Sequence, residues 1–290
     1  MNLVLNNRNG DFAHIDLSLG AALTQLNLNG QDVIKYPLKD GEPKKGYPSA
    51  ILFPFPNRVK DGKYTFEGKE YSLEMNDLEA HNAIHGLVAF ETFELISRTP
   101  SKIVAKYVYK GLNEGYPFPF EIKVIYQLKE SSLLFNVEVT NSGSGNMPYG
   151  FGWHPYFGFD GTSIGEMTLK APKRRRMELN ERYIPTGEYE VEKAQIINLK
   201  NNILDNVFAI EKEGSESEVT LRFKKKKLIV SQKTGKNKLN YMVLYIPPSR
   251  NCIAIEPQSC NTNAFNNDEG LLILASGKKN KFDISVSVEG

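Results

Sequence analysis

Apolar and polar side chains alternate with a two-residue period in many segments of this chain. The alternation is clearest at residues 120–128, and similar segments occur at 102–109, 133–140, 218–223, 228–231, 241–246 and 283–288. Side chains two residues apart lie on the same face of a strand, so the pattern predicts strands with one buried face. A sustained 3.6-residue period is missing, and only the short stretch 201–207 has a locally helical pattern.

Turn-forming residues separate these segments at short intervals. Gly, Asn, Asp and Pro recur about every 8 to 15 residues, as in Asp61-Gly62 and Thr234-Gly235. Such spacing favours an all-β fold over alternating strands and helices. We find no fixed-length repeat and no linker. The sequence therefore predicts a large antiparallel β-sandwich in which residues 1–290 form a single domain.

The composition excludes several classes of protein. A net charge of +2 over 290 residues gives no long-range field for nucleic acid or an anionic membrane. The basic runs Lys173–Arg176 and Lys224–Lys227 are interpreted as solvated faces. The polar start and the lack of an apolar run of about 18 residues predict neither a signal peptide nor a membrane span. We expect a cytoplasmic monomer or homodimer, with Cys252 and Cys260 as free thiols.

The segment Pro148–Phe157 is the most informative for function. Read as a strand, it places Gly150, Gly152 and His154 on one face and the bulky Phe151 and Trp153 on the other. Two glycines before the histidine suggest a face cleared for a ligand. Pro155 restricts His154 to an extended backbone. A lone strand histidine is more often structural, so this segment alone leaves both interpretations open.

A second segment, Asn251–Pro257, has the same design. Ile253 and Ile255 are expected in the core, which leaves Glu256 at the end of a face of small residues. A carboxylate there is either a solvent-facing residue or a base in a pocket. Burial in a pocket would raise the pKa of Glu256 toward that of a useful base.

Other candidates are weaker. His81 and His85 are four residues apart and could ligate a metal on a helix, but the Glu of a His-Glu-x-x-His site is absent. We expect no metal. Arg58, in an aromatic and proline-rich loop, could bind sugar hydroxyls or form a structural ion pair. Dinucleotide loops, phosphate loops and Gly-x-Ser-x-Gly elbows are also absent, so no cofactor is expected.

The motifs resemble those of the aldose 1-epimerases, also called galactose mutarotases. The matching pieces, in family order along most of the chain, are Asn57-Arg58, the Gly68–Tyr71 hairpin, Asn82-x-Ile84-His85-Gly86, His154-Pro155-Tyr156-Phe157, Pro185–Glu188, Leu204-Asp205 and Glu256-Pro257 followed by Ala264–Asn266. The His-Pro-Tyr-Phe and Glu-Pro elements together are the specific ones.

The resemblance implies a mutarotase-like β-sandwich with a sugar pocket on a concave sheet. It implies that Glu256 takes the proton of the anomeric hydroxyl while His154 protonates the ring oxygen. His85 would stabilise the ring oxygen, Arg58 and Asp205 would hold hydroxyls, and Asn82 is counted among the substrate-binding residues.

Two other functions remain open from the sequence. One is the epimerisation of a hexose 6-phosphate, for which Lys173–Arg176 could supply cations. The other is a sugar-binding or regulatory protein without catalysis. If the family chemistry is correct, the Glu256 carboxylate and a His154 ring nitrogen should lie within about 9 Å of each other, since each must reach one of two oxygens on the same carbon.

Overall fold

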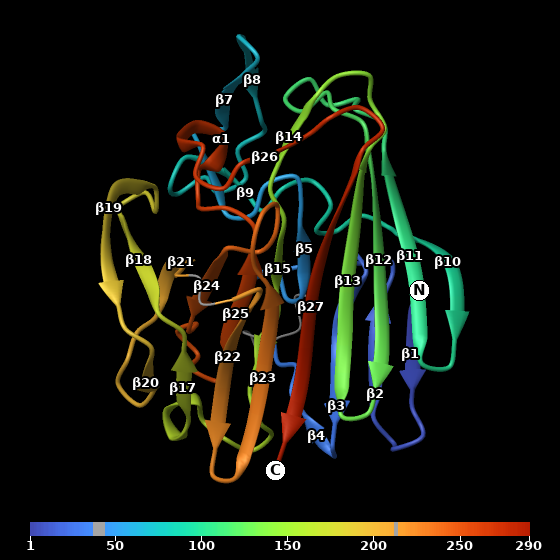
Figure 1. Cartoon of the computed structure of the whole chain (residues 1–290), viewed down its shortest axis with the longest axis vertical. Helices are drawn as coiled ribbons and strands as arrows, with labels where there is room; N and C mark the ends of the chain where they lie inside the picture. Colours follow the sequence, from blue (N-terminus) through green and yellow to red (C-terminus); the bar gives the residue numbers. More distant parts are fainter. Residues whose placement is uncertain (37–43, 212–213) are drawn as a thin grey trace.

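The computed structural model describes residues 1–36, 44–211 and 214–290, and two large antiparallel sheets dominate this part of the chain (Figure 1). The larger sheet has nine strands in the order β10 (Glu94–Thr99), β11 (Lys102–Tyr109), β12 (Phe120–Lys129), β13 (Ser132–Asn141), β27 (Lys279–Glu289), β23 (Lys226–Lys233), β22 (Glu216–Phe223), β17 (Thr168–Ala171) and β20 (Gln195–Asn198).

The second sheet has eight strands and carries most of the residues singled out for function. Its order is β19 (Pro185–Glu192), β18 (Arg174–Leu179), β21 (Asp205–Ile210), β24 (Tyr241–Tyr245), β25 (Ile253–Gln258), β15 (Gly152–His154) and β5 (Ala50–Leu52), with β16 (Tyr156–Phe157) paired to β25.

Smaller elements complete the fold. A four-stranded sheet joins β1 (Asn2–Asn6), β2 (Phe12–Asp16), β3 (Ala22–Leu28) and β4 (Gln31–Asp32). Three two-stranded sheets pair β14 (Met147–Tyr149) with β26 (Leu272–Leu274), β6 (Arg58–Lys60) with β9 (Asn82–Ile84) and β7 (Lys63–Phe66) with β8 (Lys69–Ser72). The short helices are η1 (Ile164–Glu166) and α1 (Ala264–Asn267). Figure 1 shows β7, β8, β9 and α1 gathered at one end of the molecule.

Side chains from the two large sheets meet in one apolar core. Phe135 of β13 packs on Trp153 of β15 with ring centroids 4.9 Å apart. Phe151, just before β15, stacks on Phe282 of β27 at 4.7 Å. This interlocking of inner faces is the packing of a β-sandwich and confirms the predicted fold class.

The opposite face of the eight-stranded sheet is where functional side chains collect. Neighbouring strands are in a register that pairs Asp205 with Tyr245 and Val243 with Glu256. Because alternate residues share a face, Ile253 and Ile255 enter the core while Glu256 lies on the outer side. The two-residue period thus determines which side chains are available for chemistry.

Two expectations from the sequence are wrong. Residues 201–207 are not helical, because Asp205 begins β21. Arg174 does not belong to a solvated face: it is 1% exposed, and its guanidinium is paired with Glu192. Residues 174–176 of the basic run lie on β18, where Arg174 is buried and Arg175 and Arg176 are partly exposed. In the described ranges, no helix is long and apolar enough to cross a membrane.

Candidate active site

A cavity of about 570 Å³ opens on the outer face of the eight-stranded sheet. Its lining includes five residues proposed from the sequence, namely Arg58, His85, His154, Asp205 and Glu256. They come from β6, the residue after β9, and strands β15, β21 and β25. The fold therefore brings together side chains from five separate segments of the chain.

His154 and Glu256 form the centre of the site. His154 Nε2 lies 3.4 Å from Glu256 Oε1, well inside the separation of about 9 Å set by the two-oxygen argument. Both residues are buried, at 6% and 2% exposed. Glu256 Oε2 accepts a hydrogen bond from Gln258 Nε2 at 3.1 Å, which fixes the carboxyl group relative to the histidine.

Burial controls the protonation of this pair. It raises the pKa of Glu256 to about 8, and the negative charge of Asp205 adds to the increase, while the Gln258 hydrogen bond and Arg58 act against it. Burial also lowers the pKa of His154 to about 4. Both shifts have one cause, since a low-dielectric site disfavours whichever form is charged. Between these two values the pair holds a single proton.

His85 provides a neutral hydrogen-bond donor. Burial, together with the nearby His154 and Arg58, holds the pKa of His85 well below its ordinary value, so the ring is uncharged. The backbone N–H of Asn57 donates to His85 Nδ1 at 3.3 Å. In a neutral imidazole the proton must then be on Nε2, which leaves an N–H available to an oxygen in the cavity.

Arg58 forms a structural ion pair and also lines the cavity. Both roles considered from the sequence, ion pairing and binding of sugar hydroxyls, are therefore compatible. The Nε of Arg58 donates to Asp77 Oδ2 at 2.6 Å, and its Nη1 donates to the Asn57 side chain at 3.3 Å. The guanidinium lies 4.4 Å from the centre of the Tyr183 ring. Its remaining N–H groups can serve a ligand.

Asn82 is placed differently from the other candidates. Its side chain is fully buried and donates to the Arg182 carbonyl oxygen at 3.1 Å, outside the cavity lining. The structure therefore does not place Asn82 where a sugar would touch it. Asp205, by contrast, lines the cavity at the start of β21 and is exposed to solvent.

Gly150 and Gly152 do not clear a face for a ligand, contrary to the expectation from the sequence. A Cβ on Gly150 would lie 2.4 Å from Cys260 Sγ, and one on Gly152 would lie 2.8 Å from Pro56 Cβ. Protein atoms, rather than a ligand, occupy the space beside these glycines. The two glycines allow Pro56 and Cys260 to pack closely against this segment. Of the residues on this face, only His154 lines the cavity.

Several cavity residues were missed by sequence reasoning. Tyr245 shares its face of β24 with Val243, a pairing that the alternation in residues 241–246 contained. Arg182 and Tyr183 come directly before the Pro185–Glu188 motif but have no chemical signature of their own. Asp77 lies in an irregular segment, where only the fold reveals its partner Arg58.

A metal site at His81 and His85 would require both residues on one face of a helix. The two histidines flank the extended strand β9 instead of lying one turn apart on a helix. No group of three or more potential ligands that could hold a metal ion is present in residues 1–36, 44–211 and 214–290. Cys252 and Cys260 are buried free thiols.

Comparison with known proteins supports one family. The model of the aldose 1-epimerase family matches residues 3–287. The uncharacterized protein YihR of Escherichia coli (strain K12) is 28% identical over 285 residues, which cover 96% of this chain and 90% of that protein. Galactose mutarotase of Bos taurus is 29% identical over 154 residues, covering 50% of this chain and 43% of the bovine one.

Solved structures share the fold over nearly the whole chain. A GalM/aldose epimerase homologue from C. elegans superposes with a TM-score of 0.86, at 18% identity, and covers 100% of this chain and 98% of its own. A galactose mutarotase-like protein from Clostridium acetobutylicum gives 0.84 at 19% identity, with 97% and 93% covered. At such identities the likeness concerns the fold.

Proposed function

The chain belongs to the aldose 1-epimerase family, and from this premise we propose that it interconverts the α and β anomers of a free, uncharged hexose. The observation that carries the proposal is the 3.4 Å contact between His154 and Glu256 in a sugar-sized cavity. Anomer exchange needs one proton removed and one delivered at neighbouring oxygens. A pair that holds one proton can do both.

The reaction follows from this arrangement. Glu256 removes the proton of the anomeric hydroxyl while His154 delivers one to the ring oxygen, and the bond between C1 and the ring oxygen breaks. The open aldehyde turns about its C1–C2 bond and closes again with the proton transfers reversed. His85 donates its Nε2–H to the ring oxygen region, and Arg58 and Asp205 hold hydroxyl groups.

These roles require a carboxylate and an imidazolium. Burial favours the uncharged form of both groups, which keeps the proton on Glu256. The two arrangements differ by the movement of one proton across the His154–Glu256 contact. Sugar hydroxyls that donate to the carboxylate, together with the charge of Arg58, favour the reactive arrangement once substrate is bound.

The charges around the cavity favour a free hexose over a hexose 6-phosphate. The two lining arginines are already paired, Arg58 with Asp77 and Arg182 with Asp61. The other charged residues at the rim, Glu79, Glu181 and Asp205, are acidic. None of Lys173–Arg176 lines this cavity. A phosphate would therefore meet carboxylates with no unpaired cation among the described lining residues.

Polarimetry tests the reaction and the charge preference together. Freshly dissolved α-glucose and α-galactose should lose optical rotation faster with the protein than without it. Glucose 6-phosphate should give a lower kcat/KM than glucose. A higher kcat/KM for the phosphate would favour the alternative substrate, and sugar binding without acceleration would favour a non-catalytic relative.

The pH dependence of turnover is a separate prediction. The singly protonated pair exists between the pKa of His154, about 4, and that of Glu256, about 8. We expect a bell-shaped profile of kcat/KM that falls about tenfold per pH unit below the lower value and above the upper one. Stopped-flow polarimetry from pH 3.5 to about 9.5 checks it. A rate that keeps rising above pH 9 would contradict the shared-proton pair.

A further inference from the structure

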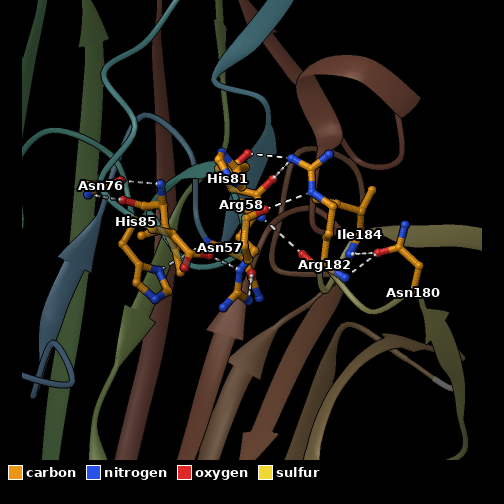
Figure 2. A network of polar contacts seen from close by, with 12 residues as sticks. Asn57, Arg58, Asn76, His81, His85, Asn180, Arg182 and Ile184 are labelled. Carbon is orange, nitrogen blue, oxygen red and sulfur yellow. Dashed lines mark hydrogen bonds and ion pairs between the residues drawn. The ribbon is translucent and has the colours of Figure 1, made fainter.

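Residues 181–183, in the turn between β18 and β19, line the cavity. Figure 2 shows Arg182 of this turn with its polar contacts. Asn180 closes this turn: its Oδ1 accepts from the backbone N–H of Arg182 at 2.9 Å and of Ile184 at 3.1 Å. The backbone N–H of Tyr183 donates to the Asn180 carbonyl at 2.9 Å. The turn is therefore a defined structure that presents Arg182 and Tyr183 to the site.

Arg182 connects the turn to residues 80 and 81 and to Asp61 by hydrogen bonds. Its Nε donates to the Ala80 carbonyl at 2.9 Å, and its Nη2 lies 2.6 Å from the His81 carbonyl and 2.7 Å from Asp61 Oδ1. Its own carbonyl accepts from Asn82. Figure 2 shows the guanidinium extended toward His81. This gives Asn82 a role in holding the turn, which explains why it is buried beside the site and not in it.

Tyr183 is held in an unfavourable conformation. Its φ is +61°, in the left-handed region that bulky residues rarely adopt. Such a conformation persists when the surrounding structure imposes it, and it is concentrated at functional sites. Here the Arg182 contacts and the Asn180 hydrogen bonds on either side impose it. Asn57 and His85, which also line the cavity, have positive φ values of 55° and 65°.

The side chain of Tyr183 is an aromatic part of the cavity lining. The Tyr183 ring covers the Arg58 guanidinium at 4.4 Å, yet 42% of the residue remains exposed. A tyrosine buried on one side and open on the other offers a rigid apolar surface and a phenol hydroxyl to a ligand. Sugar rings present that combination, with C–H groups on their faces and hydroxyls at their edges.

We infer that Tyr183 is a substrate-contacting residue that sets sugar affinity, and that Arg182 is the positioning residue that holds it over the cavity. The inference rests on the proposed function, because it assigns a role in binding the same sugar. Arg182 and Tyr183 then form part of the sugar-binding site. The inference also predicts that the two residues act as a unit, since Arg182 acts only through the placement of Tyr183.

The test compares two tyrosines of one hairpin. Tyr183→Ala should raise KM for the turned-over hexose about tenfold, the loss expected for one aromatic contact, with little change in kcat. Tyr189→Ala is the matched control, because Tyr189 also covers an arginine, Arg175 at 5.0 Å, but does not line the cavity. It should leave KM unchanged. Alanine at position 183 can keep the positive φ of the tyrosine and lacks only the ring. The melting temperatures of the variants should therefore stay close to that of the wild type.

A double-mutant cycle tests the link between the two residues. Arg182→Ala should raise KM by a similar factor, and the Arg182→Ala/Tyr183→Ala variant should be no worse than the single variants. Multiplicative effects, or a Tyr183→Ala enzyme with wild-type KM, would overturn the inference. Calorimetric dissociation constants for the same sugar give an equivalent comparison. A wild-type protein that binds sugar without accelerating mutarotation would instead overturn the proposed function.

Discussion

Replacing Glu256 by Gln is expected to slow mutarotation by about 100-fold to 10,000-fold, the usual contribution of a positioned acid or base. Glutamine keeps the shape of the side chain and can still contact Gln258, but it cannot accept the proton of the anomeric hydroxyl. His154→Asn should produce a loss of the same order, because no acid is then left to protonate the ring oxygen, to which the uncharged His85 donates only a hydrogen bond. Initial rates from polarimetry at saturating sugar measure both effects.

The two losses should not multiply. Glu256 and His154 share one proton across 3.4 Å, so removing either partner disables the pair. The double variant should therefore be about as slow as the slower single variant. A double variant slower by the product of the two factors would mean that the residues act independently. Unchanged circular dichroism and a cooperative melt are needed to assign each loss to chemistry.

Glu256→Gln is also expected to make the protein more stable at alkaline pH. The pKa of Glu256 rises from 4.5 to about 8 in the folded protein, so the native state holds this proton more tightly than the unfolded chain does. Between pH 4.5 and 8 the unfolded chain loses this proton while the native state keeps it, so the free energy of unfolding falls progressively as pH rises through this range. One pKa unit corresponds to about 1.36 kcal/mol, which sets an upper limit of about 5 kcal/mol. Glutamine has no charge to bury.

Urea unfolding at several pH values measures this difference. The free energy of unfolding of the variant minus that of the wild type should be small near pH 4.5, increase up to about pH 8 and then remain constant. Glu70→Gln, a change at an exposed residue of β8 outside the cavity, should remain within about 0.5 kcal/mol throughout. If the difference in the free energy of unfolding between Glu256→Gln and the wild type does not vary with pH, burial does not destabilise the ionised carboxylate of Glu256.

Catalysis and stability place opposite demands on Glu256. A buried carboxyl with a pKa near neutrality suits proton transfer, but it weakens the fold when it ionises. The left-handed conformations of Asn57, His85 and Tyr183 have the same character.

The strand pattern, and with it the two faces of the key strands, can be predicted from the order of the residues. Alternation in residues 251–257 requires Glu256 to lie opposite Ile253 and Ile255, whatever the strand packs against. The motifs around His154 and Glu256 then identified the chemical pair through their resemblance to a family. Both kinds of information are local, since each depends on residues a few positions apart.

Which distant segments meet can be seen only in the folded protein. Nothing near Gly152 shows that Pro56 fills the space beside it, and nothing near Asn82 shows that its side chain holds Arg182, which is 100 positions away. The partners of Arg58 are likewise Asp77 and Tyr183, each in a different loop. Contacts between irregular segments depend on the path of the chain and have no period, so no local pattern specifies them. The physical reason is that strand geometry is repeated along the chain, whereas loop geometry is set by the sheets that the loops connect.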